Sequence, residues 1–276
     1  MSAPAAPIRD ARRSVPILMY HEIATPSETK SHLAVSPDQF ATQVQYLHDA
    51  GYQTLTFTEA AAALAAGQGQ VPARSVVLTF DDGYADFHRR ALPLLEKFGF
   101  TATVFMTTGW MADAGQHAAG TALGPTMSWS QVREAAAAGV EIGAHSHSHP
   151  ELDQIAGAQL RDELTTPKEL LEEGIGQPVP SLAYPFGYSN AQVRRAVRTA
   201  GYQHASAVAN AMATAGGDEF AVPRLTVRAT LRPETFERVV RGGQESTIYL
   251  KDHALTKGYA VVRRTKAVIG GISRRA

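Results

Sequence analysis

The sequence contains no cysteine among its 276 residues. Disulfide bonds, zinc sites built from thiolates and cysteine nucleophiles are therefore excluded. An excess of charge of one sign is also missing, because 26 Lys and Arg residues balance 26 Asp and Glu residues. Proteins that bind nucleic acids usually carry a clear basic excess. The sequence therefore predicts no nucleic-acid partner.

Long apolar runs are absent as well. The sequence has no uninterrupted stretch of about 18 apolar residues, the length needed to cross a membrane. Its first twenty residues lack the apolar segment of a secretory signal. From the sequence alone we expect no transmembrane segment and a cytoplasmic location.

Apolar segments of strand length alternate with amphipathic helical segments along most of the chain. The predicted strands are residues 15–23, 53–57, 75–81, 101–107, 140–144, 181–184, 204–208 and 225–227. The predicted helices are residues 37–50, 58–66, 84–98, 129–138, 159–173, 191–200 and 233–242. Ser36 is a plausible N-cap for the first helix, and Ser128 or Ser130 for the fourth. Repeated strand–helix units predict an α/β protein with a parallel sheet covered by helices, either closed as a barrel or open and doubly wound.

The chain shows no linker rich in Pro or Ser. We therefore expect one catalytic domain over residues 15–243, after an N-terminal extension over residues 1–14. Residues 244–276 form a tail with seven Lys or Arg against Glu245 and Asp252. One interpretation of this tail is weak contact with anionic membrane surfaces, at about 1 kcal/mol per basic residue. The other, which we favour, is a solvated helix packed on the domain.

Two adjacent carboxylates end the apolar strand 75–81, in the segment T-F-D-D-G that closes with Gly83. Active sites of parallel α/β proteins are built at the carboxyl ends of strands. Two carboxylates at such a place are costly unless a cation or a proton lies between them. Helix capping is the alternative, since acidic residues favour helix starts, but it suits one aspartate better than the pair Asp81 and Asp82.

Three histidines follow the strand 140–144, in the segment H-S-H-S-H-P over residues 145–150. A spacing of four residues places His145 and His149 on the same side of a helix or of a strand. A lone buried histidine is more often a hydrogen-bonded core residue, but three in five positions favour metal binding. Two histidines and one aspartate leave a coordination position open for water, as in catalytic zinc sites. We therefore predict a metal site that does not use His147.

The order of these motifs resembles that of a known family. The segment T-F-D-D-G, then H-S-x-x-H-P some sixty residues later, then A-Y-P-F-G over residues 183–187, are similar to the first three motifs of the polysaccharide deacetylase family (NodB homology, carbohydrate esterase 4). Residues 16–21 (P-I-L-M-Y-H) and 40–55 resemble the branch of poly-β-1,6-N-acetylglucosamine deacetylases. The likeness extends over roughly residues 15–230.

The resemblance implies a distorted (β/α) barrel with about seven parallel strands and a divalent metal, usually zinc. It implies that Asp82, His145 and His149 hold the metal and that Asp81 is the general base. Elementary chemistry agrees, because a divalent cation lowers the pKa of a coordinated water and polarises a carbonyl. The sequence places these four residues at the ends of two predicted strands.

The resemblance also implies an oxyanion and substrate segment at Tyr184, Pro185 and Phe186, where the backbone N–H of Phe186 stabilises the negative oxygen. The arginine that usually steadies the base is missing, since the two residues before Tyr184 are apolar. Arg224, on a later predicted strand, can supply that charge. The alternative for Arg224 is a surface salt bridge, which contributes little.

An amine leaves a tetrahedral intermediate only when it is protonated, so a general acid is required. The Leu-x-His motif that commonly supplies it is absent near the C-terminus. The branch resemblance points to His21 instead. Ile17, Met19 and His21 share one face of their predicted strand, which brings His21 to the strand end. A neighbouring carboxylate or the negative intermediate is expected to keep its ring protonated near neutral pH; a purely structural histidine is the alternative.

The sequence thus predicts an enzyme that removes acetyl groups from a glycan or precursor containing N-acetylglucosamine. A related amide hydrolase, deformylase-like or acting on a small molecule, is one alternative, because the catalytic parts would be the same. A carbohydrate-binding protein without turnover is the other. The presence of Asp81, Asp82, His145 and His149 favours the enzyme.

Overall fold

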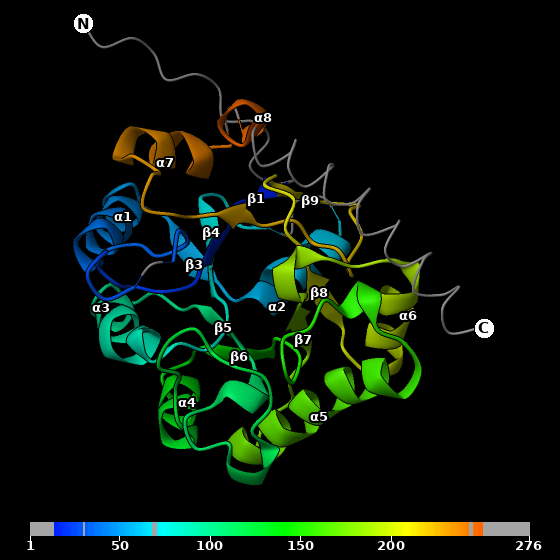
Figure 1. Cartoon of the computed structure of the whole chain (residues 1–276). Helices are drawn as coiled ribbons and strands as arrows, with labels where there is room; N and C mark the ends of the chain where they lie inside the picture. Colours follow the sequence, from blue (N-terminus) through cyan, green and yellow to red (C-terminus); the bar gives the residue numbers. More distant parts are fainter. Residues whose placement is uncertain (1–13, 30, 68–70, 243–244, 251–276) are drawn as a thin grey trace, which may run out of the picture.

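A curved parallel sheet forms the centre of the molecule, which we describe from a computed structural model over residues 14–29, 31–67, 71–242 and 245–250. The strands are β2 (Ile17–Tyr20), β3 (Gln53–Leu55), β4 (Ser75–Phe80), β5 (Thr103–Met106), β6 (Glu141–Ala144), β7 (Ser181–Ala183), β8 (His204–Ser206) and β10 (Leu225–Thr226). Their order is β10-β2-β4-β5-β6-β7-β8, and β3 pairs with the first half of β4. Helices lie around the outside of these strands (Figure 1).

The segment 222–226 connects the two edges of this sheet, because it pairs with β8 at one edge and with β2 near the other. Val222 forms a parallel bridge to Ser206, the last residue of β8, and its amide donates to the carbonyl of Ala205 at 3.0 Å. Three residues further on, β10 pairs Leu225 with Leu18 of β2. The sheet therefore curls back on itself, and the predicted distorted (β/α) barrel with about seven parallel strands is confirmed.

The helices follow the predicted segments closely. They are α1 (Pro37–Asp49), α2 (Phe57–Ala65), α3 (Leu92–Lys97), α4 (Trp129–Ala137), α5 (Gly157–Ile175), α6 (Ala191–Thr199), α7 (Pro233–Val240) and α8 (Glu245–Ile248). Ser36 caps α1 as predicted, and Ser128 rather than Ser130 caps α4. Helix α2 begins one residue earlier than expected, because Thr56 and Glu59 form a capping box.

Two prolines account for the main differences from the predicted elements. Pro16 cannot donate into a strand ladder, and the predicted strand 15–23 is divided there into β1 (Ser14–Val15) and β2. Strand β1 instead pairs antiparallel with β9 (Ala213–Thr214), which the sequence did not predict. The predicted helix 84–98 opens with a π-helical turn over Phe87–Ala91 before α3. Pro93 lies just after this turn and cannot donate the helical hydrogen bond to Arg89.

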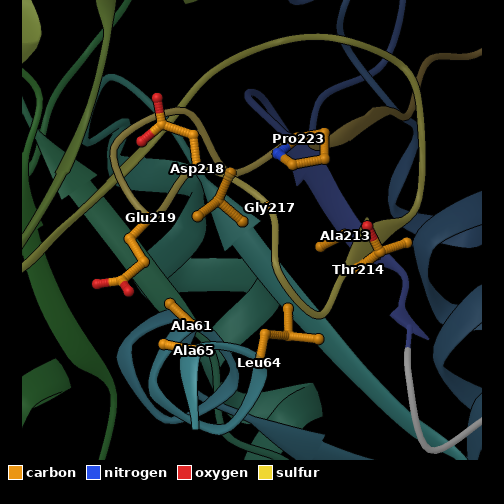
Figure 2. A pocket seen from close by; sticks show the side chains of 10 residues that line it. Ala61, Leu64, Ala65, Ala213, Thr214, Gly217, Asp218, Glu219 and Pro223 are labelled. Carbon is orange, nitrogen blue, oxygen red and sulfur yellow. The ribbon is translucent and has the colours of Figure 1, made fainter. Parts of the chain in front are cut away.

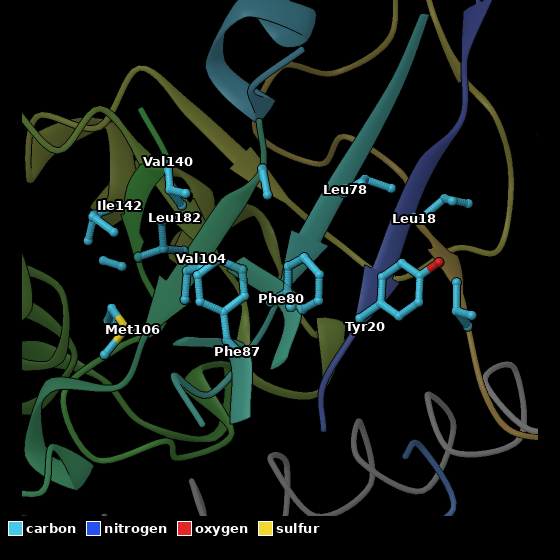
Figure 3. Close-up of a cluster of buried hydrophobic side chains, with 14 of the residues drawn as sticks. Leu18, Tyr20, Leu78, Phe80, Phe87, Val104, Met106, Val140, Ile142 and Leu182 are labelled. Carbon is cyan, nitrogen blue, oxygen red and sulfur yellow. The ribbon is translucent and has the colours of Figure 1, made fainter. Parts of the chain in front are cut away.

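Successive residues of the central strands face opposite sides of the sheet. Those that face outward pack beneath the surrounding helices in one large cluster, as Figure 3 shows for Leu18, Tyr20, Leu78, Phe80, Val104, Met106, Ile142 and Leu182. Those that face inward pack in a second cluster with helix α2, and include Ile17, Val77, Phe105 and Ala183. Each fully buried side chain of this kind contributes roughly 1.5–3 kcal/mol. The inward face of β2 continues through Met19 to His21, and that of β4 through Thr79 to Asp81.

The carboxylate of Glu141 links α2 to three strands at the amino end of the barrel. Glu141, at the start of β6, accepts hydrogen bonds from the amide and hydroxyl of Thr58 in α2. It also accepts from the hydroxyls of Thr103 and Ser181 on the flanking strands. Acceptors of this kind satisfy the free N–H groups at a helix start. These bonds anchor α2 at the amino end, whereas Asp81, Asp82 and His145 follow the opposite, carboxyl ends of β4 and β6.

The start of the predicted tail contacts the barrel. Tyr249 is buried, and its hydroxyl donates to the carbonyl of Thr226 at 2.8 Å. Residues 251–276, which hold all of the tail's basic side chains, lie outside the described residues, as do residues 1–13. The boundary at residue 243 and the membrane contact therefore stay predictions. Among the described helices, none combines the length and apolar character that crossing a membrane requires.

Candidate active site

Asp82, His145 and His149 come together at the carboxyl end of the barrel. Asp82 follows β4, and the two histidines follow β6; β5 separates these strands in the sheet. The Oδ1 atom of Asp82 lies 3.4 Å from the Nε2 atom of His145 and 3.4 Å from that of His149. One nitrogen or oxygen atom from each residue falls within 4.8 Å of the others. The structure thus brings together the three residues predicted to hold a metal.

The chemistry of this cluster fits a divalent cation. The Oδ1 atom of Asp82 is buried and has no hydrogen-bond partner among the described residues. The Nδ1 atom of His145 is 2.8 Å from the carbonyl oxygen of Ala183, to which it donates, so its Nε2 atom carries a lone pair. Such a bond fixes the tautomer of a metal-binding histidine. A carboxylate oxygen and two imidazole nitrogens that face one another without a shared proton are a suitable ligand set for zinc.

In all three residues burial shifts the pKa so that the uncharged form is favoured. Burial and the neighbouring Asp81 carboxylate raise the pKa of Asp82 to about 7. Burial and the nearby His145 lower the pKa of His149 to about 3, and burial lowers that of His145 as well. Burial disfavours a charged form that has no counter-charge. A cation at this place would therefore stabilise the Asp82 carboxylate while meeting two neutral histidines.

Asp81 is held by a buried arginine. The Nη1 atom of Arg224 donates to Oδ1 of Asp81 at 2.6 Å, and Nη2 donates to Oδ2 at 2.7 Å. Nη1 also donates to the Thr79 hydroxyl at 3.1 Å. Arg224 is 0% exposed, so the alternative of a surface salt bridge is wrong. Burial alone would raise the pKa of Asp81, but the charges of Arg224 and His145 hold it well below its usual range.

His21 lies beside Asp81. Strand register pairs Tyr20 with Phe80, and the Asp81 amide donates to the Tyr20 carbonyl at 3.0 Å. The next residues, His21 and Asp81, therefore adjoin at the strand ends. In the free protein the neighbouring carboxylate is not sufficient to keep the His21 ring protonated near neutral pH, as one part of the expectation required. Burial lowers the pKa of His21 to about 4, an effect larger than the opposing charge of Asp81.

The predicted oxyanion segment is mostly buried. Tyr184 is inside the protein, where its hydroxyl donates to the carbonyl of Phe220 at 2.8 Å, and Pro185 is buried next to it. Phe186 is 53% exposed, and its ring centre lies 4.7 Å from that of His149. Its backbone has the left-handed angle φ 59°. Of the three residues, only Phe186 therefore offers its side chain to a ligand.

The side chain of His147 is not part of the cluster of Asp82, His145 and His149. Its Nδ1 atom is hydrogen-bonded to the Thr108 hydroxyl at 2.8 Å. Its backbone amide donates to Glu163 of α5 at 2.9 Å. Sequence reasoning did not identify Glu163, because a glutamate within a helix is usually a solvated surface residue. Its contacts can be recognised only when α5 is placed against the histidine segment.

A separate cavity lies between α2 and the segment 213–223 (Figure 2). It is lined by Ala61, Leu64, Ala65, Ala213, Thr214, Gly217, Asp218, Glu219, Val222 and Pro223. Its volume is about 20 Å³, room for roughly one water molecule. No candidate site residue lines this cavity, and it is too small for a sugar.

The comparison with protein families identifies the chain. The polysaccharide deacetylase family model matches residues 68–205, which is half of the 276 residues. The chain belongs to the polysaccharide deacetylase family. The resemblance deduced from the motifs is thereby confirmed. His21 and Arg224 lie outside the part of the chain that the family model matches.

Relatives and solved structures agree with the family assignment. The chain is 34% identical over 190 residues to the polysaccharide deacetylase YxkH of Bacillus subtilis, a match over 68% of this chain but only 62% of that protein's length. It is 23% identical over 226 residues to a Staphylococcus aureus poly-β-1,6-N-acetyl-D-glucosamine N-deacetylase, covering 78% of this chain and 73% of that protein. The structure of the Streptococcus pyogenes deacetylase PplD, in complex with acetate, superposes with a TM-score of 0.73 and 28% identity, covering 82% of this chain and 98% of PplD.

Proposed function

We propose that this chain is a metal-dependent hydrolase that removes acetyl groups from N-acetylated sugars, in a glycan or glycan precursor that contains N-acetylglucosamine. The observation that carries the proposal is the unpartnered Asp82 oxygen, which faces two histidine nitrogens next to a second aspartate clamped by Arg224. The Staphylococcus aureus relative, a deacetylase of poly-β-1,6-N-acetyl-D-glucosamine by name, supports the choice of substrate class.

Asp82, His145 and His149 are the residues that would hold the metal, and zinc suits this set of ligands. When bound, a divalent cation would lower the pKa of a nearby water and polarise the acetyl carbonyl. Burial and the charge of Asp81 raise the pKa of Asp82 above its usual aqueous value. Because the ligands must be deprotonated to bind, Asp82 supplies the negative charge and the two histidines stay neutral.

Asp81 serves as the general base in this proposal. Its two oxygens are engaged by the guanidinium of Arg224, which keeps the carboxylate ionised and fixes its orientation. An ionised carboxylate at the strand end can take the proton of the attacking water. The backbone N–H of Phe186 is proposed to donate to the oxyanion that develops on the acetyl group.

His21 is proposed as the proton donor to the departing amine. Burial keeps its ring neutral in the free protein, so the ring must take up a proton from solvent during the reaction, and Asp81 returns to solvent the proton that it takes from the attacking water. The negative charge of Asp81 already favours the protonated ring, and the negative tetrahedral intermediate would favour it further. The C–N bond then breaks as the nitrogen receives this proton, and the products are acetate and a free amine.

Acetate release from a panel of N-acetylglucosamine oligomers tests the proposed function. We expect release by the purified protein, loss of release after a chelator removes the metal, and recovery when zinc is added back. Formate released from N-formylated substrates in place of acetate would indicate the related amide hydrolase. Oligomer binding with neither product, in protein shown to contain zinc, would indicate a carbohydrate-binding protein and overturn the proposal.

Replacing His21 with alanine is expected to lower acetate release by a factor on the order of 10²–10⁴, the usual effect of losing an acid–base group. The metal content should stay unchanged, because His21 is not among the three predicted ligands. Acetate release and zinc content are measured on the same preparation. His32→Ala is the matched control, since His32 is an exposed histidine near His21. A fully active His21→Ala variant would assign the donor to another residue or to water.

A further inference from the structure

The histidine segment, residues 145–150 between β6 and α5, has a strained backbone conformation at two positions. Ser146 and His149 both have the left-handed angle φ 62°. Residues other than glycine rarely adopt this conformation, which costs of order 1–3 kcal/mol for each. Such a backbone persists only when its surroundings hold it in place. His149, one of the predicted metal ligands, is therefore positioned by contacts beyond its own strand.

Glu163 of α5 provides a large part of these contacts. Its side chain is buried, with an exposed fraction of 8%. The Oε2 atom accepts hydrogen bonds from the backbone amides of His147 and Ser148, both at 2.9 Å. The Oε1 atom accepts from the hydroxyl of Ser148. A carboxylate that receives two successive backbone N–H groups and a hydroxyl occupies an anion-binding concavity of the chain.

The remaining contacts hold the segment from its other sides. The Ser146 hydroxyl oxygen accepts a hydrogen bond from the His149 amide at 3.0 Å. The Gly109 amide donates to the His147 carbonyl at 2.8 Å. These bonds are local or come from the 3-10 turn over Thr108–Trp110 that follows β5, and Glu163 is the charged group that holds the segment from α5. Charge-assisted hydrogen bonds of this type are roughly twice as strong as neutral ones.

We infer that Glu163 is a positioning residue, which sets the place of His149 through the backbone of residues 147 and 148 and thereby sets the affinity for the metal. This inference rests on the proposed function, because it takes the cluster of Asp82, His145 and His149 to be the metal site. Glu163 contributes no atom to that cluster. Groups that orient metal ligands in this way typically change metal affinity by about 10–100-fold when removed.

The test replaces Glu163 with glutamine, which keeps the shape but loses the charge and turns one acceptor into a donor. We expect zinc affinity, measured in competition with a chromophoric chelator, to fall by about 10–100-fold. Asp162→Asn is the matched control: it makes the same change of charge one residue earlier on α5, where the side chain is 67% exposed. The control should bind zinc as tightly as the wild type does.

A double-mutant cycle separates positioning from a general loss of structure. In a His149→Ala background, Glu163→Gln should weaken zinc binding no further, because the residue through which it acts is gone. An equal loss in both backgrounds, or unchanged affinity in the single variant, would overturn the inference. Ser148→Ala, which removes one of the three donors to Glu163, serves if Glu163→Gln does not fold; it should weaken zinc binding several-fold.

Hydrogen exchange in the metal-free proteins provides a measurement that needs neither zinc nor a substrate. The amides of His147 and Ser148 should exchange faster in Glu163→Gln than in the wild type or in Asp162→Asn. If the wild type releases no acetate, the proposed function fails, but faster exchange would still support the role of Glu163. Unchanged exchange would overturn that role whatever the outcome of the activity assay.

Discussion

Asp81→Asn is expected to lower acetate release by a factor on the order of 10²–10⁴, the usual effect of removing a general base, while zinc binding stays near normal. The amide of asparagine has nearly the shape of the carboxylate but cannot take a proton from water. Asp81 is not among the three residues whose ligand atoms converge. Turnover of an N-acetylglucosamine oligomer and zinc content are measured on the same sample.

Asp82→Asn is the contrasting variant, because it alters the neighbouring carboxylate and retains Arg224 and its partner. It should lose zinc, since the Oδ1 atom of Asp82 lies 3.4 Å from both histidine nitrogens, and activity should fall with the metal. If Asp81→Asn instead loses its zinc and regains activity when zinc is added in excess, the roles of the two aspartates are reversed.

Arg224→Met is expected to destabilise the folded protein by about 3–5 kcal/mol at neutral pH, because removing one partner of a buried ion pair leaves the other charge uncompensated. The guanidinium makes two short bonds to Asp81, and both side chains are buried, at 0% and 3% exposed. Methionine fills a similar volume without the charge. Unfolding in urea at pH 7 measures the loss.

The loss of stability in Arg224→Met should shrink as the pH falls. In the wild type, Arg224 holds the pKa of Asp81 below its unfolded value of about 3.9. The resulting stability is fully present above that value and disappears as the pH falls through the lower folded pKa. Without Arg224, burial raises the pKa of Asp81, so the carboxyl is protonated and tolerated in mild acid.

The double variant Asp81→Asn with Arg224→Met should recover part of the stability at pH 7, whereas a loss equal to the sum of the single variants would show that the pair is not coupled.

Local patterns in the sequence predicted most strands and helices, because each depends on residues close in the chain. The same kind of pattern singled out Asp82, His145 and His149, whose ligand atoms the structure brings within 4.8 Å of one another. The alternation in β2 agrees with the sequence pattern, since Ile17 packs in the inward cluster and Leu18 in the outward one. The adjacent aspartates and the four-residue histidine spacing each end a strand, and a parallel sheet brings such ends to one edge. The choice between an open sheet and a barrel came from the family resemblance instead, since the periodicity of apolar residues does not distinguish the two architectures.

What the sequence could not predict depends on closure of the barrel and on burial. Arg224 was proposed as a partner of Asp81 only because the usual arginine was missing; the two short bonds depend on β10 lying beside β2. The effect of burial on the pKa of His21 was not predicted, because a neighbouring carboxylate can be guessed from the sequence but the cost of burial cannot. Glu163 acts across a helix–loop contact that no spacing in the sequence indicates.

The segment 222–226 both closes the barrel and carries Arg224. Translation proceeds from the amino end, so His21, Asp81, Asp82, His145 and His149 all leave the ribosome before this segment does. A chain interrupted at residue 221 would possess every predicted ligand and the predicted base, but the base would lack its cation and β2 would have an unpaired edge. The ion pair of Asp81 and Arg224 therefore forms late in synthesis, and an incomplete chain can carry the predicted ligand set without the arginine-bound aspartate of the proposed mechanism.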